Sequence, residues 1–166
     1  MKKLVLFLAA FSVFFASCEK SEEDKNPIDA SKVRLLMDGY WQLTGFYLVE
    51  DIDGETPGFP IDLYTPMPGC EKDNIFKFTS SSTFMTYEMD SKCSMSAPDE
   101  YEWYYQLSQA EKHITMWSNA DDRENSIVFD GEIFYPKLTE FYIKYKVYNP
   151  TTEKMDEYSR YYTKKQ

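Results

Sequence analysis

The stretch DGYWQLTGFYLVE, residues 38–50, decides the fold that the sequence predicts. From Tyr40 onward its side chains alternate with a period of two, which is typical of a strand with one face toward a core. The residues just before it predict a short helix, which Asp29 or Ser31 can cap and which Gly39 ends. We expect the buried face of the strand to carry Trp41, Leu43, Gly45, Tyr47 and Val49.

Seven further segments show the same alternation, and each predicts a strand. They cover residues 74–78, 83–89, 101–107, 113–117, 126–138, 141–148 and 155–163. Nearly all links between them are short, so neighbouring strands are expected to run antiparallel as a meander. A meander of about eight strands removes its exposed edges by closing into a barrel. The predicted class is therefore all-β: an eight-stranded antiparallel meander β-barrel with a short N-terminal helix.

Three segments leave alternatives or carry special roles. Residues 83–89 can bury either Phe84 and Thr86 or the set Met85, Tyr87 and Met89. Residues 126–138 form one long strand or a hairpin that turns at Asp130-Gly131. The connection at residues 51–69 holds four prolines, which exclude a central strand. A connection of this length is typically a functional or covering loop.

The composition favours a β domain and excludes a nucleic-acid partner. Fourteen tyrosines and twelve phenylalanines are residues that suit pleated, half-buried surfaces. The formal net charge is −10, and no basic cluster offsets it. Such a chain repels the phosphate backbone of nucleic acids.

The first residues have the form of an export signal. Lys2 and Lys3 precede an apolar run at residues 4–15, which is shorter than the about 20 residues that a membrane-spanning helix needs. The tetrapeptide FASC, residues 15–18, resembles a bacterial lipobox, with phenylalanine where leucine is usual. The resemblance implies a signal peptide at residues 1–17 and acyl chains, such as palmitate, on Cys18. The alternative is an ordinary secreted protein in which Cys18 is a free thiol.

Residues 18–28 predict a flexible acidic tether, because residues 19–26 contain no aromatic or β-branched side chain. The sequence CEKSEED, residues 18–24, resembles an export signal with which some Gram-negative bacteria send lipoproteins to the cell surface. The alternative is a solvated spacer. We expect an outer-membrane lipoprotein, periplasmic or surface-exposed, that the N-terminal lipid holds on the membrane. The barrel domain then covers residues 29–166.

Two cysteines remain after Cys18, namely Cys70 and Cys93. An even pair in an exported protein indicates a disulfide. Metal binding is the alternative, but two thiols and a single distant histidine make a poor zinc site.

The stretch at residues 38–50 resembles the first strand of a lipocalin, where a Gly-x-Trp follows a short helix and the tryptophan plugs the closed end of the barrel. Gly39 and Trp41 match this motif. The segment between the two cysteines, and the later strands at residues 101–107, 113–117 and 138–148, resemble bacterial lipocalin-like lipoproteins. In many lipocalins an arginine packs on the tryptophan, and the candidate here is Arg160.

We expect a small apolar or amphipathic ligand inside the barrel. The predicted contacts are Trp41, Tyr47, Phe78, Trp103, Tyr105, Phe141 and Tyr145, and the same inner face would carry Leu43, Phe76, Ile114, Met116 and Ile143. Gly45 would leave space beside them, and the hydroxyls of Tyr47, Tyr105 and Tyr145 would meet water or a polar group of the ligand. The pocket would lie under the connection at residues 51–69, with Trp41 at the opposite, closed end.

No motif indicates an enzyme, a metal site or a cofactor. The chain has no Ser/His/Asp set, no phosphate-binding glycine loop and no zinc motif. His113 is the single histidine, and its strand position predicts that it faces solvent. The run DDREN, residues 121–125, lacks the spacing of a calcium loop and predicts a solvated turn.

Three functions are therefore open. The first is a carrier of a small ligand in the barrel. The second is a surface module that recognises glycans or proteins through exposed aromatic residues, with Tyr40, Phe59, Tyr64 and Trp117 as candidates. The third is a structural lipoprotein whose barrel is filled by its own side chains.

Replacing the predicted lipid-bearing residue, Cys18→Ala, tests the anchor. Because stable anchoring needs covalent acyl chains, the variant should leave the membrane fraction and appear in the soluble fraction. Fractionation of cells that produce the wild type or the variant measures this. Continued sedimentation of Cys18→Ala with membranes would contradict the lipobox.

Overall fold

The structure is a computed structural model that describes residues 27–49 and 58–165. The predicted signal peptide at residues 1–17, the predicted lipid site Cys18 and tether residues 19–26 lie outside the described residues. The described elements are α1 (Pro27–Met37), β1 (Tyr40–Val49), β2 (Ile61–Asp62), α2 (Gly69–Lys72), β3 (Ile75–Phe78), β4 (Thr83–Tyr87), β5 (Glu100–Ser108), β6 (His113–Trp117), β7 (Ile127–Lys137), β8 (Glu140–Asn149) and β9 (Lys154–Lys165).

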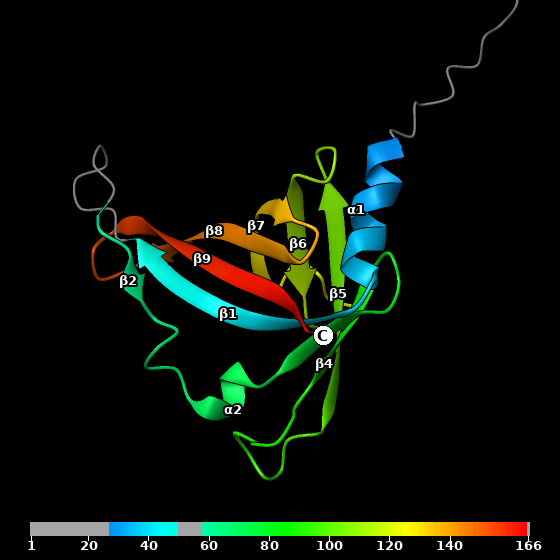
Figure 1. The fold of residues 1–166 in the computed structure, drawn as a ribbon. Helices are drawn as coiled ribbons and strands as arrows, with labels where there is room; N and C mark the ends of the chain where they lie inside the picture. Colours follow the sequence, from blue (N-terminus) through cyan, green and yellow to red (C-terminus); the bar gives the residue numbers. More distant parts are fainter. Residues whose placement is uncertain (1–26, 50–57, 166) are drawn as a thin grey trace, which may run out of the picture.

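Eight antiparallel strands form a closed barrel. The strand order is β1-β3-β4-β5-β6-β7-β8-β9, and β9 pairs back onto β1, which closes the sheet. Figure 1 shows β9 lying between β8 and β1. The short strand β2 adds to the edge of β1 through two residue pairs. The predicted eight-stranded meander is therefore confirmed, and each predicted segment corresponds to one strand.

A β-bulge in β1 changes which side chains face inward. The pairing with β9 shifts between Leu43 and Gly45, so Thr44 is an extra residue and the alternation reverses after it. Trp41 and Leu43 are buried inside the barrel. Beyond the bulge, the ring of Tyr47 lies 5.6 Å from that of Tyr161, beside a groove on the outer surface.

The prediction that Gly45, Tyr47 and Val49 share the inner face of Trp41 is therefore wrong, because a strict period of two does not survive an inserted residue. Gly45 also leaves no space inside the barrel. A Cβ atom at this position would come within 3.0 Å of the Tyr47 ring and 3.4 Å of Tyr161. The glycine instead lets these two rings pack closely over the strand.

The two open alternatives of the sequence are resolved by the strand register. Phe84 and Thr86 are buried, so β4 turns these residues inward. Residues 127–137 form a single strand, β7, and the chain does not turn at Asp130-Gly131. In β9, Arg160 and Tyr162 face the interior, where they line a cavity.

Helix α1 closes one end of the barrel. Leu36 is fully buried, and the indole Nε1–H of Trp41 donates a hydrogen bond of 2.7 Å to its carbonyl oxygen. The helix begins at Pro27, so Asp29 and Ser31 lie within it and the prediction that one of them is the N-cap is wrong. A proline suits the first helical position because its fixed φ is already helical and its missing N–H would have no partner there.

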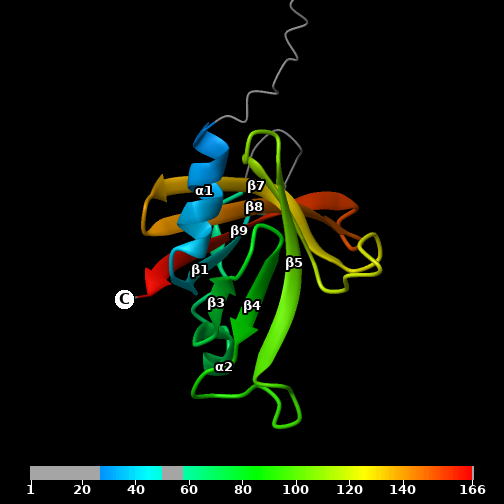
Figure 2. The ribbon, with the colours of Figure 1, turned by 90° about the vertical axis from the view of Figure 1, so that its right-hand side faces the viewer.

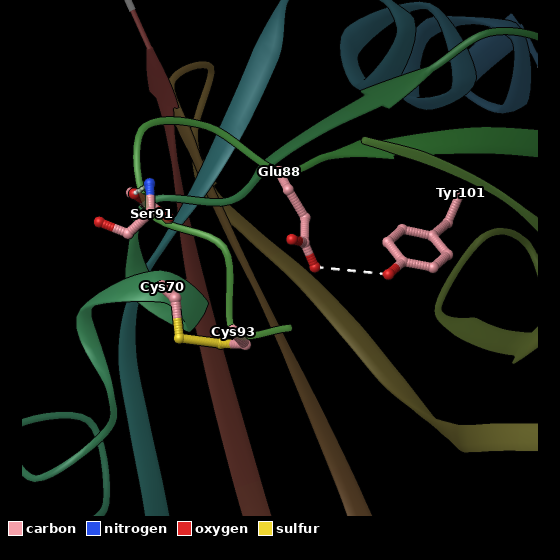
Figure 3. The surroundings of a disulfide bond; sticks show 6 residues. Cys70, Glu88, Ser91, Cys93 and Tyr101 are labelled. Carbon is pink, nitrogen blue, oxygen red and sulfur yellow. Dashed lines mark hydrogen bonds between the residues drawn. A yellow bond between two sulfur atoms is a disulfide. The ribbon is translucent and has the colours of Figure 1, made fainter. Parts of the chain in front are cut away.

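The predicted disulfide between Cys70 and Cys93 is confirmed, with the two Cα atoms 5.2 Å apart. It joins α2 to the connection between β4 and β5, as Figure 3 shows. Nearby, the Tyr101 hydroxyl donates to Glu88 Oε1 at 3.5 Å. Figures 1 and 2 place this region at the end of the molecule away from α1. The disulfide and the helix therefore constrain different ends of the barrel.

Removing the disulfide in the double variant Cys70→Ala/Cys93→Ala should lower the free energy of unfolding by about 3 kcal/mol, because the bond closes a loop with a sequence separation of 23 residues. Urea unfolding of the wild type and the variant measures this difference. A reductant should destabilise the wild type by the same amount and leave the variant unchanged. A loss below about 1 kcal/mol would contradict the loop-closure account.

Candidate functional site: a cavity inside the barrel

The barrel interior holds a cavity of about 180 Å³ that is partly open to solvent. Side chains from every barrel strand except β1 line it, together with one residue just before β3. These residues are Asn74, Phe76, Phe78, Phe84, Thr86, Trp103, Met116, Val128, Phe129, Phe141, Arg160 and Tyr162. The wall is mostly aromatic, and Arg160 is the single charged side chain among the described residues that line it.

Ring-to-ring contacts fix the aromatic wall. Phe78 packs edge-on against Tyr105 with ring centroids 5.0 Å apart, and Phe141 stacks on Tyr162 at 4.7 Å. The rings of Phe84 and Trp103 are parallel within 11°. Offset-stacked and edge-on pairs are the favoured geometries of aromatic side chains. The cavity is thus bordered by residues that hold one another in place rather than by loose side chains.

Arg160 supplies the polar end of the cavity. Its guanidinium lies 4.6 Å from the ring centroid of Phe46 and 5.9 Å from that of Phe129. Its Nε–H donates a hydrogen bond of 3.1 Å to the Tyr145 hydroxyl. Burial disfavours the charged form, but the hydroxyls of Tyr162 and Tyr145 outweigh this effect and raise the pKa of Arg160. The side chain is therefore a permanent cation inside the barrel.

Two further polar atoms in the cavity wall have no hydrogen-bond partner among the described residues. They are Nε1 of Trp103 and Oδ1 of Asn74, and both atoms are buried. Nearly all buried polar atoms in folded proteins are paired, and an exception points to a bound water, an ion or a function. The cavity therefore combines a mostly apolar wall with the cation of Arg160, while the unpaired donor and acceptor belong to wall residues and are themselves buried.

Three of the seven predicted ligand contacts line this cavity, namely Phe78, Trp103 and Phe141. Trp41 lies behind them, with its ring 4.9 Å from that of Phe141. Tyr47 lies on the outer surface because of the bulge.

The other two predicted tyrosines are held by protein partners. The Tyr105 hydroxyl donates a hydrogen bond of 2.8 Å to the carbonyl oxygen of Ser80, and this side chain is fully buried. The Tyr145 hydroxyl accepts from Arg160, as described above. The expectation that these hydroxyls meet water or ligand directly is therefore wrong for Tyr105. For Tyr145 the contact with a ligand would run through the arginine.

The sequence predicts that the connection at residues 51–69 covers the pocket, but the described part of that connection does not border the cavity. None of residues 58–69 lines the cavity. The backbone amides of Leu63 and Tyr64 both donate to the carbonyl oxygen of Phe46, so this segment is held alongside β1. Residues 51–57 of the predicted cover lie outside the described residues. Asn74, which follows α2, takes the place at the cavity wall that we expected from the connection.

Arg160, Tyr162 and Phe129 line the cavity, but the sequence did not predict them as ligand contacts. The sequence predicts that Arg160 packs on Trp41, but its guanidinium lies over Phe46 and Phe129 instead. The alternation of β9 offered a usable signal. Tyr158, Arg160 and Tyr162 share one face, and a cation between two aromatic residues on one face is unusual for a solvated strand.

The outer surface carries a second hollow, a groove of about 830 Å³ over β1, β8 and β9. Three tyrosine rings form its floor: Tyr142 stacks on Tyr161 at 4.9 Å, and Tyr161 meets Tyr47 edge-on. An ion pair between Lys144 and Glu157 borders it, with the Lys144 Nζ 3.3 Å from Glu157 Oε1. The groove is wide and polar at its rim, in contrast to the interior cavity.

The four aromatic candidates for surface recognition do not form one platform: Tyr40 and Phe59 are exposed, whereas Tyr64 and Trp117 are partly buried. Tyr40 packs against Tyr87, while Trp117 stacks on Tyr104 and is covered by the guanidinium of Arg123 at 4.7 Å. Tyr64 lies under the amine of Lys72 at 5.2 Å, and Phe59 is almost fully exposed. These rings belong to separate parts of the surface.

His113 and the turn at residues 121–125 have protein partners. The His113 Nε2 lies 2.8 Å from Asp130 Oδ1 on the neighbouring strand. In the turn, Asp122 Oδ1 accepts a hydrogen bond of 2.9 Å from the side-chain amide of Asn125. Within residues 27–49 and 58–165, no group of three or more His, Cys, Asp or Glu side chains gathers in a geometry that could hold a metal ion.

Tyr105→Phe tests the dry burial of this hydroxyl. Burial raises the pKa of Tyr105 to about 12 from its ordinary 10.0, so in this pH window the folded chain keeps a proton that the unfolded chain releases. The free energy of unfolding therefore falls as the pH rises, by about 1.4 kcal/mol per pH unit for one proton. We expect the variant to be less stable near neutral pH, because Ser80 loses its donor, and to decline less steeply above about pH 10.

Urea unfolding between about pH 7 and 11 measures both effects, and Tyr148→Phe, at an exposed position, is the matched control. The control should follow the wild type throughout. Equal slopes for the wild type and Tyr105→Phe above about pH 10 would contradict the assigned burial.

The geometry of the barrel agrees with a comparison of the chain with protein families. A family model described as a lipocalin-like domain matches residues 37–135, which is more than half of the chain. None of the curated proteins compared with the chain matches it. The matched segment begins in α1 and runs to β7, so it contains Trp41, most of the cavity wall and the disulfide. The chain therefore belongs to the lipocalin-like domain family.

Proposed function

We propose that this chain is a membrane-anchored lipocalin-like lipoprotein that binds one small apolar or amphipathic ligand inside its barrel and catalyses no reaction. The observation that carries the proposal is the cavity of about 180 Å³ among the side chains of seven strands. An eight-stranded barrel has room either for packed side chains or for one small ligand. Here the large aromatic residues fill most of the interior and leave one compact space.

The size of the cavity limits the ligand. An engineered apolar cavity of about 150 Å³ in another protein binds benzene, and about 180 Å³ corresponds to roughly six waters at about 30 Å³ each. The ligand would therefore be about the size of one aromatic ring or of a short aliphatic chain. The cavity also argues against the alternative of a structural lipoprotein with a completely filled barrel.

The membrane part of the proposal rests on the first residues. The short apolar run at residues 4–15 and Cys18 fit a lipoprotein signal, and the acidic residues that follow fit a tether. Among residues 27–49 and 58–165, no helix is long and apolar enough to cross a membrane. We propose an outer-membrane location, with the barrel in the periplasm or at the cell surface.

Recognition of a glycan or a protein at the surface is a second candidate, and the outer groove favours it. Tyr47, Tyr142 and Tyr161 present aromatic faces in a hollow that also contains charged side chains. Aromatic residues with a polar rim are typical of recognition surfaces. The two candidates use opposite faces of the same strands, so variants can separate them.

Toluene tests whether the interior cavity accepts a ligand. It should bind the purified protein, raise the melting temperature by mass action and shift the NMR signal of the Trp103 indole N–H. Thr86→Phe would fill the cavity and abolish these effects, because Thr86 is buried in its wall. The matched control is Thr44→Phe at an exposed position of the outer face, which should bind toluene like the wild type. The proposal would be overturned if toluene and its polar analogues benzamide and benzoate all had no effect on the wild type.

A further inference from the structure

Arg160 is a partly buried cation that forms no ion pair with a carboxylate among the described residues. It is the single charged residue in the cavity wall, and none of the five salt bridges among the described residues includes it. Its neighbours are uncharged: the rings of Phe46 and Phe129 and the hydroxyls of Tyr145 and Tyr162. Charged side chains are rarely buried in proteins unless an opposite charge pairs with them.

The acids of the chain do not solve this problem. The formal net charge is −10, so carboxylates are abundant. The carboxylates of the neighbouring β9 residues, however, have other partners. Glu157 pairs with Lys144, and Asp156 accepts a hydrogen bond of 2.7 Å from the side-chain amide of Asn149. The two aromatic rings stabilise the guanidinium partly, through cation–π contacts. An anion is still the partner that a desolvated arginine binds most strongly.

The geometry points to a ligand that supplies this anion. We propose that the cavity binds a small monocarboxylate, with its carboxylate on the guanidinium of Arg160 and its apolar part against the rings of Phe78, Phe84 and Trp103. A planar guanidinium presents parallel N–H groups that match the two oxygens of a carboxylate. One cation balances one negative charge, and the volume admits one aromatic ring or a short chain. This inference rests on the proposed function, because it names the ligand class of the same cavity.

The other polar groups near the cavity leave Arg160 as the cation for this ligand. Trp103 Nε1 and Asn74 Oδ1 expose almost no surface to the cavity, so the ionic contact with a ligand there rests on Arg160. The outer surface offers no equivalent site for the same anion in the groove, where Lys144 already pairs with Glu157 and Lys137 with Glu140. Among the cations of the groove and of the cavity, Arg160 is the one that has no carboxylate partner within the described residues.

Benzoate and benzamide form a matched pair of probes, because they have nearly the same shape and differ in charge. Isothermal titration calorimetry with the wild type should show benzoate binding roughly tenfold to a hundredfold more tightly than benzamide, as expected for hydrogen bonds between ionised groups. In Arg160→Gln this preference should disappear. Arg123→Gln removes the same charge from an arginine that also covers an aromatic ring, but at an exposed position, and it should keep the preference.

Toluene, which carries no polar group, separates the two proposals. If toluene or benzamide binds and benzoate binds no more tightly, the monocarboxylate inference is wrong and the proposed small-ligand function stands. If none of the three probes binds the wild type, the proposed function fails and the inference falls with it. If Arg160→Gln does not fold, the wild-type comparison decides alone, together with the NMR signal of the Arg160 Nε–H, which benzoate should shift and benzamide should leave nearly unchanged.

Discussion

The pairing of β1 with β9 is the constraint on which the rest of this structure depends. It joins the first and the last strand of the barrel along nearly their whole length, from Tyr40 opposite Lys165 to Val49 opposite Glu157. Without it, the remaining strands would form an open sheet with two exposed edges and no enclosed interior. The pairing also brings Arg160 opposite Phe46, so the contact that holds the guanidinium exists only in the closed barrel. Closure of the barrel and the position of Arg160 at the cavity therefore both depend on the pairing of β1 with β9.

The cavity follows from the kind of side chains that fill the barrel. Rings such as those of Phe78, Tyr105 and Phe141 bury a large area, but they are rigid and meet at fixed edge-on or stacked angles. Flexible aliphatic side chains could adapt to fill the remaining space, whereas these rings leave a defined void. The position of Arg160 beside that void explains why the void is not simply apolar. An interior of aromatic residues thus produces both rigidity and a place for a ligand.

The sequence was sufficient for the architecture and insufficient for the site. Alternation over residues 141–148 and 155–163 marks strands because it depends only on local periodicity, and the two cysteines define a disulfide because few alternatives exist. The prediction of the site failed at Tyr47. The extra residue Thr44 reverses which side chains of the strand face inward, and the residue pattern gives no sign of this bulge. The prediction failed at Tyr105 because the partner of its hydroxyl, the Ser80 carbonyl, belongs to a backbone turn and has no signature in the side-chain pattern. Arg160 required knowledge of which strands meet, since its neighbours Phe46 and Phe129 are more than 30 residues away in the chain.

Because the strands are synthesised in sequence order, the barrel cannot close until β9, the last of them, has been made. A ribosome completes β1 through β8 before it makes the strand that both closes the barrel and carries the cation of the cavity. Until β9 emerges, β1 has no long partner beyond its short contacts with β2 and β3, and the interior remains open to water. A nascent chain therefore cannot hold a ligand in this cavity. A product truncated before β9 would lack both the strand that closes the barrel and the cavity residues Arg160 and Tyr162, so a form without β9 is not expected to keep the barrel or the cavity.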